Sequence, residues 1–136
     1  MTAEIKNANT LEIVVGFKNF GLTPAYDVCQ FIDRWIGEYP LKTALKEPSS
    51  IQNGSQGVLF PGPEYWTGTT VDMTKKPPVG EDNALFIYGK ITYRDAFKNE
   101  RYMKYRYCFH PTDKVPSLVI GQKMLLNVDT AGNEAN

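Results

Sequence analysis

The residues best suited to chemistry are Cys108 and His110, which stand two positions apart. Residues at this spacing on a strand share a face, so a thiol and an imidazole here form the pair that nucleophilic catalysis by cysteine requires. Such a site also needs an oxyanion loop, and no glycine-rich elbow accompanies the pair. We therefore expect a core cysteine and a surface histidine, and we predict that the chain is not an enzyme.

Two pairs of carboxylates have the residue types for acid–base work on a sugar. They are Asp27 with Asp33, and Glu81 with Asp82. Asp27 follows a turn and is expected to accept backbone hydrogen bonds, while Glu81 and Asp82 lie in a Gly/Asn loop and are expected to be solvated. A calcium site needs a denser oxygen cluster, and the single histidine argues against zinc. We predict no metal and no cofactor.

The cysteines, Cys29 and Cys108, are far apart in the sequence and have no Cys-x-x-Cys spacing. Two outcomes remain open at this point. They are two buried free thiols, or they form one disulfide that closes a long loop and contributes roughly 4 kcal/mol in the chain-entropy picture.

Aromatic side chains are abundant, with eight Tyr, seven Phe and two Trp. A binding platform for a sugar or a peptide is one interpretation, and its candidate residues are Trp35, Tyr39, Tyr65 and Trp66. The other interpretation is that these aromatics are core residues and cross-strand pairs of a small β-sandwich. The second interpretation is favoured.

The charge balance argues against nucleic-acid binding, because fifteen basic and fifteen acidic residues cancel. Five basic residues nevertheless fall close together, and we expect them to be solvent-facing strand residues: Arg94, Lys98, Arg101, Lys104 and Arg106. No apolar run approaches the roughly 20 residues that a membrane-spanning helix needs.

Alternating and β-branched residues predict strands over most of the chain. The predicted strands are 2–6, 10–18, 58–60, 64–73, 84–94 and 101–109, with one strand or two short ones in 115–128 and a polar tail at 132–136. A long connection at 37–57 includes a short helical turn at Leu41–Lys46. Residues 25–36 are ambiguous, because their apolar spacing fits a helical stripe slightly better than a strand.

About seven or eight strands with at most one short helix predict an antiparallel β-sandwich, formed as a single domain by residues 1–136.

Two segments resemble a group of uncharacterised bacterial membrane-anchored proteins. The first is Asn19-x-Gly21-x-Thr23-Pro24-Ala25-x-Asp27-Val28, and the second is Tyr88-Gly89-x-Ile91-x-Tyr93-x-Asp95-x-Phe97. Members of this group have one or two membrane helices near the N-terminus, followed by an immunoglobulin-like β domain. The resemblance implies an immunoglobulin-like sandwich here, in which residues 25–36 are a strand.

The resemblance also implies a setting. We expect the chain to be the soluble part of a longer protein that is held to the membrane by a segment absent from this sequence, with the domain in the periplasm or outside the cell. Its expected function is non-enzymatic, as contact with a protein partner or as envelope structure; the alternative is a carbohydrate-binding module using exposed aromatics. An exposed edge strand would offer a site for pairing with a partner or with a second copy.

Overall fold

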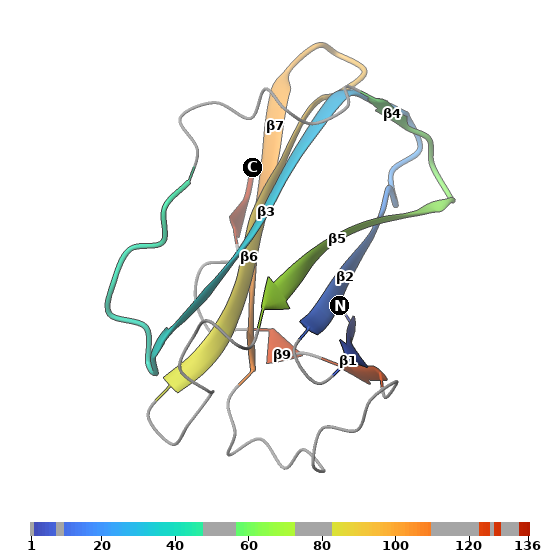
Figure 1. The fold of residues 1–136 in the computed structure, drawn as a ribbon. Coiled ribbons are helices and arrows are strands. Elements are labelled where there is room, and N and C mark those ends of the chain that lie inside the picture. Colours follow the sequence, from blue (N-terminus) through green and yellow to red (C-terminus); the bar gives the residue numbers. More distant parts are fainter. Residues whose placement is uncertain are drawn as a thin grey trace.

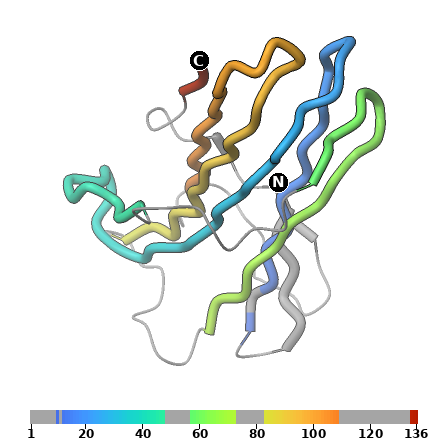
Figure 2. The backbone as a smooth tube through the Cα atoms, turned by 90° about the horizontal axis from the view of Figure 1, so that it is seen from above, coloured from blue at the N-terminus to red at the C-terminus, as the bar shows by residue number. Residues whose placement is uncertain are grey.

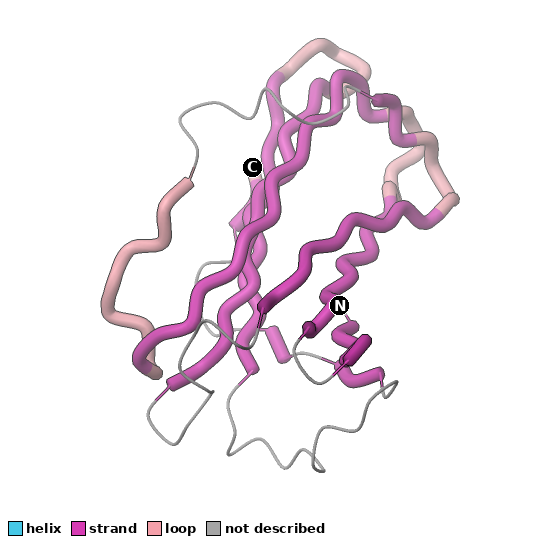
Figure 3. Tube along the Cα trace, in the orientation of Figure 1, coloured by secondary structure: helices cyan, strands magenta, loops and turns pink. Residues whose placement is uncertain are grey.

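The computed structural model describes residues 2–7, 10–47, 57–72, 83–109, 123–125, 127–128 and 134–136, and the side chains of most of them. Every element in these residues is a strand, and all strand pairs are antiparallel (Figures 1 and 3). The predicted all-β antiparallel sandwich is confirmed. Six strands are long, and four short ones of two or three residues complete the sheets.

The first sheet has the order β5-β2-β1-β8. Its strands are β5 (Glu64–Asp72), β2 (Thr10–Lys18), β1 (Thr2–Asn7) and β8 (Lys123–Leu125). The second sheet has the order β10-β7-β6-β3-β4, and β9 (Asn127–Val128) also pairs with β7. Its other strands are β10 (Glu134–Ala135), β7 (Glu100–Phe109), β6 (Asn83–Arg94), β3 (Ala25–Glu38) and β4 (Gly57–Leu59).

The core lies between the sheets. Val15 of the first sheet packs with residues of the second sheet, including Val28 and Ile91, and Ile13 and Val71 are almost fully enclosed. Alternation along each strand gives this inner face its apolar residues.

Strand β6 is the exception to alternation, because residues 84–89 are buried on both faces. Ala84 and Phe86 face away from the first sheet, yet they are fully buried and pack with Leu41. Leu41 belongs to residues 39–47, a segment without regular structure that we call the strap. The helical turn predicted at Leu41–Lys46 is therefore wrong: these residues run over the outer face of the second sheet, and sheet contacts replace helical hydrogen bonds.

The strap also explains why residues 25–36 resembled a helix. Strand β3 lies between the first sheet on one face and the strap on the other, so most of its residues are partly buried and its apolar pattern does not alternate strictly. The prediction of a strand is confirmed, and the helical preference is overturned. The polar tail is also ordered as a strand at its end, since β10 pairs with Met103 and Lys104.

Candidate functional site

In the described part of the chain, the two sheets do not close over each other between β2 and β7. Two adjoining cavities of about 400 and 370 Å³ open there. Both are lined by Phe17, Ile91 and Met103, and the larger one extends along Val15, Tyr105 and Tyr107. We call these cavities together the open groove. Its lining is largely apolar, with Lys104 and Glu134 at one side.

Strand β2 borders this groove with a backbone edge that pairs with no other described strand. The ladder with β1 runs only from Thr10 to Val14, where Thr2 is the last paired residue. On its other edge β2 stays paired with β5 as far as Lys18. Within the described residues, the β1-side edge from Val15 to Lys18 therefore pairs with no strand. An unpaired edge beside an apolar groove is the combination that recognises an extended peptide.

The groove has a rigid floor. The Tyr105 ring lies across Gly89 on the inner face, and its hydroxyl donates a hydrogen bond of 3.5 Å to the Phe31 carbonyl on β3. Burial raises the pKa of this hydroxyl well above its usual value, so it stays protonated. The groove is thus equipped for packing and backbone pairing, and its side chains include no nucleophile beside a base.

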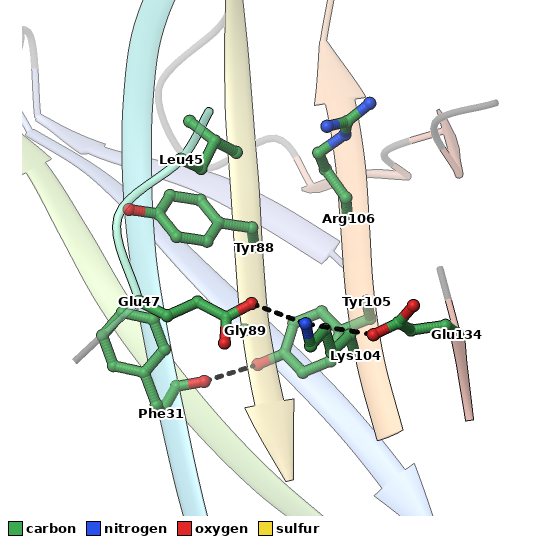
Figure 4. A pocket seen from close by; sticks show the side chains of 9 residues that line it. All are labelled: Phe31, Leu45, Glu47, Tyr88, Gly89, Lys104, Tyr105, Arg106 and Glu134. Carbon is green, nitrogen blue, oxygen red and sulfur yellow. Dashed lines mark hydrogen bonds and ion pairs between the residues drawn. The ribbon is translucent and has the colours of Figure 1, made fainter. Parts of the chain in front are cut away.

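A smaller cavity of about 200 Å³ lies on the outer face of the second sheet, under the strap (Figure 4). Lys104 projects into it from β7 and forms ion pairs of 3.0 Å with both Glu47 of the strap and Glu134 of β10. Glu47 also lies 3.7 Å from the Lys90 ammonium. Tyr88 donates a 3.1 Å hydrogen bond to the Lys46 carbonyl.

These contacts join three segments and have a structural use. Hydrogen bonds to Glu47 and Glu134 raise the pKa of the Lys104 ammonium above its usual value, and the bond from Lys104 lowers the pKa of Glu134. Lys104 and Glu134 therefore stay charged near neutral pH. We call this arrangement the Lys104 clasp, because it holds the strap and the C-terminal strand against the sheet.

The four aromatic residues predicted as a platform are not brought together. Trp66 stands opposite exposed Gly16 on the outer face of the first sheet, whereas Trp35 stands opposite Phe86 on the outer face of the second. Tyr39 lies on the same outer face as Trp35 and stacks on Phe86, with 6.5 Å between the ring centroids. Tyr65 faces inward and stacks on Phe17 at 6.1 Å. The alternative interpretation, core and cross-strand pairs, fits Tyr65, which stands opposite Phe17, but not Tyr39, which is 45% exposed and lies outside the strands.

The cysteines are free thiols in this structure. Cys29 stands opposite Thr92 and Cys108 opposite Phe86, both on strands that flank β6. Six residues along β6 separate these positions by about 20 Å, at roughly 3.3 Å a residue. A disulfide needs Cα atoms within about 7 Å, so the structure selects the free-thiol alternative. The cysteines also share one sheet, and no bridge between sheets is formed.

The candidate carboxylates take structural positions. Asp27 pairs with Arg94, and Asp33 accepts a hydrogen bond of 2.8 Å from the Arg34 amide. Six residues of β3 separate them, or about 20 Å, which is too far for the two carboxylates of a glycosidase. His110, Glu81 and Asp82 lie outside the described residues, so the Cys108–His110 pairing and the Glu81–Asp82 pairing are not assessed.

The clustered basic residues are mostly ion-paired with carboxylates. Arg94 pairs with Asp27, Arg101 with Asp95 at 3.1 Å, and Lys104 with two glutamates. The Arg106 guanidinium lies over the Phe86 ring at 5.9 Å. These contacts leave no uniform basic stripe for a phosphate backbone.

Comparison of the chain with family models, with curated proteins and with solved structures gives no match. Within the described ranges, no helix is long and apolar enough to cross a membrane. In the same part of the chain, no three His, Cys, Asp or Glu side chains gather as metal ligands.

The open groove is the feature that sequence reasoning missed. Its apolar residues read as ordinary core positions of β2, β6 and β7, and nothing in their spacing indicates that they lie at an opening.

Proposed function

We propose that this chain is a non-enzymatic interaction domain that binds an extended segment of a protein partner in the open groove. The observation that supports it is the apolar cavity beside Val15–Lys18, a stretch of β2 whose β1-side edge pairs with no strand among the described residues. An added strand would satisfy the β2 backbone and place alternate side chains against Phe17 and Met103. This is the protein-contact function that the sequence predicts, with a surface assigned to it.

The wider setting is part of the same proposal. Along the chain, β1 and β2 lie in the first sheet, β3 and β4 in the second, β5 in the first, and β6 and β7 in the second. Strand β2 lies between β1 and β5, and β6 lies between β3 and β7. This connectivity supports an immunoglobulin-like domain, and with it a place in the membrane-anchored bacterial group, on the periplasmic or extracellular side. The carbohydrate-binding alternative has weaker support, because Trp35 and Trp66 stand on opposite outer faces.

Site-specific photo-crosslinking tests the proposal. A benzoylphenylalanine at Met103, which lines the groove and is 39% exposed, is compared with the same probe at Thr70, which is exposed on β5. In cells that express the native protein, we expect a discrete adduct from position 103, with the crosslinked peptide in an extended segment of the partner. Equal labelling from both positions, or none from position 103, would contradict the proposal.

A further inference from the structure

A second surface, at one end of the sandwich, carries apolar side chains that the core does not use. Three turns meet there: residues 19–24 between β2 and β3, residues 60–63 between β4 and β5, and residues 95–99 between β6 and β7. Figure 2 shows them side by side. The first two are linked by a 3.3 Å hydrogen bond from the Gly62 amide to the Asn19 carbonyl, and the Asp27–Arg94 ion pair joins β3 and β6 next to the first and third turns. We call this surface the loop end.

The apolar side chains of the loop end protrude almost completely into solvent. Leu22 is 99% exposed, Phe20 86% and Phe97 84%, and Phe60 adds a further 58%. Exposed apolar groups that cluster on one surface mark a contact site. Phe20 and Leu22 belong to the first turn, Phe60 to the second and Phe97 to the third, and we call these protruding side chains the prongs.

The polar backbone of these turns is largely satisfied from within. The Asn19 side chain donates to the Thr23 carbonyl at 2.9 Å and accepts from the Gly21 amide at 2.8 Å. The Asp95 carboxylate accepts from the amides of Phe97 and Asn99, both at 2.9 Å. Turns closed in this way present few free donors or acceptors to a protein partner. Because these turns satisfy part of their backbone themselves, they suit the interfacial region of a bilayer, whereas irregular loops do not enter its hydrocarbon core.

The charges around the prongs balance. Arg94 pairs with Asp27 and Arg101 with Asp95, Lys18 stands opposite Glu64 in the β2–β5 ladder, and Lys98 is followed two residues later by Glu100. The loop end therefore carries no strong field of either sign, and attraction would come from apolar insertion. The Lys18 ammonium lies over the Phe20 ring, 5.3 Å from its centroid, and it must turn from the ring to the lipid headgroups when Phe20 is buried.

We propose that the loop end inserts Phe20, Leu22 and Phe97 into the interfacial region of a lipid bilayer. The domain would then rest on a membrane by three prongs, with the open groove along its side left accessible. Phe20 also lines one of the two groove cavities, whereas Leu22 and Phe97 line neither, so variants of Leu22 and Phe97 test membrane contact separately from partner binding.

Vesicle sedimentation tests the insertion. The purified chain is mixed with large unilamellar vesicles of phosphatidylcholine, with and without 30% phosphatidylglycerol. We expect binding to both, with affinities within about threefold, because the local charges cancel. Burial of one Phe or Leu side chain corresponds to roughly tenfold in partition, so Phe20→Ser, Leu22→Ser and Phe97→Ser should each weaken binding about tenfold, and the triple variant should not sediment.

The matched control is Trp66→Ser, which removes a large aromatic that is 58% exposed on the outer face of the first sheet. Circular dichroism of each variant checks that it is folded. A Phe97→Trp variant should gain a blue-shifted emission component that brominated phosphatidylcholine quenches. The proposal is overturned if the chain does not sediment with vesicles, or if it binds anionic vesicles only. It is also overturned if Trp66→Ser weakens vesicle binding as much as the prong variants do, or if the chain forms a dimer without lipid that the prong variants abolish.

Discussion

Gly89 is the position where the smallest substitution should have the largest effect on stability. It lies in the middle of β6, buried, between Ile32 of β3 and Tyr105 of β7. A methyl group here would overlap two oxygens, the Phe31 carbonyl and the Tyr105 hydroxyl. The Phe31 carbonyl belongs to the sheet backbone and cannot move aside, and displacing Tyr105 would break its bond to that same carbonyl.

The expected magnitude for Gly89→Ala follows from three contributions. Overpacking a tight site costs about 1–3 kcal/mol. Losing the long Tyr105 hydrogen bond costs about 0.5–1 kcal/mol, and the reduced entropy of the unfolded chain returns about 0.4–1 kcal/mol. We expect the free energy of unfolding to fall by about 2 kcal/mol, the net of these principles' ranges.

Equilibrium urea unfolding measures this change, and Gly16→Ala is the matched control. A methyl at Gly16 would also be too close to an aromatic, 2.6 Å from Trp66 Cζ3. That ring is 58% exposed and can turn away, so we expect a change within about 1 kcal/mol, the scale of the unfolded-state gain. Equal losses in the two variants, or a stable Gly89→Ala, would refute the view that backbone contact decides the cost. If Gly89→Ala does not fold, Tyr105→Phe measures the hydrogen bond alone.

The remaining predictions concern thiols, a turn and the C-terminal strand. Under non-reducing conditions we expect two free thiols, with Cys29 reacting faster than buried Cys108; a Cys29–Cys108 peptide in mass spectrometry would contradict the register. The Asp95 carboxyl should titrate below its usual pKa in an NMR titration, because hydrogen bonds from Asn99, Arg101 and Phe97 outweigh the opposing effect of burial. The stability that this turn contributes is then present above about pH 4 and is lost as the pH falls further. An Asp95→Asn variant should lose that acid dependence. Deleting residues 134–136 removes β10 and one partner of the Lys104 clasp, and this exposes the edge of β7. Sedimentation velocity should then detect more self-association through that edge. Unchanged sedimentation would show that β10 does not protect the β7 edge.

Several parts of the fold could be predicted from the sequence because their signals are local. Residues 84–94 alternate or stay apolar without interruption, and the Asp95–Asn99 turn has the residues that close a hairpin. The positions of Trp35 and Trp66 on opposite outer faces could not be predicted, because period-two alternation fixes which residues share a face of one strand but not which face of which sheet is outermost.

The amino-acid sequence by itself determined the all-β class, the long strands and the hairpin of β6 and β7, since these depend on neighbouring residues and on the two-residue period of a strand. Tertiary structure alone decided that residues 39–47 become a strap, that Cys29 and Cys108 lie too far apart to bond, and that side chains of β2, β6 and β7 line an apolar groove. Each of these depends on register and on contacts between segments remote in sequence, where the chain's local preferences are weak and packing determines the outcome.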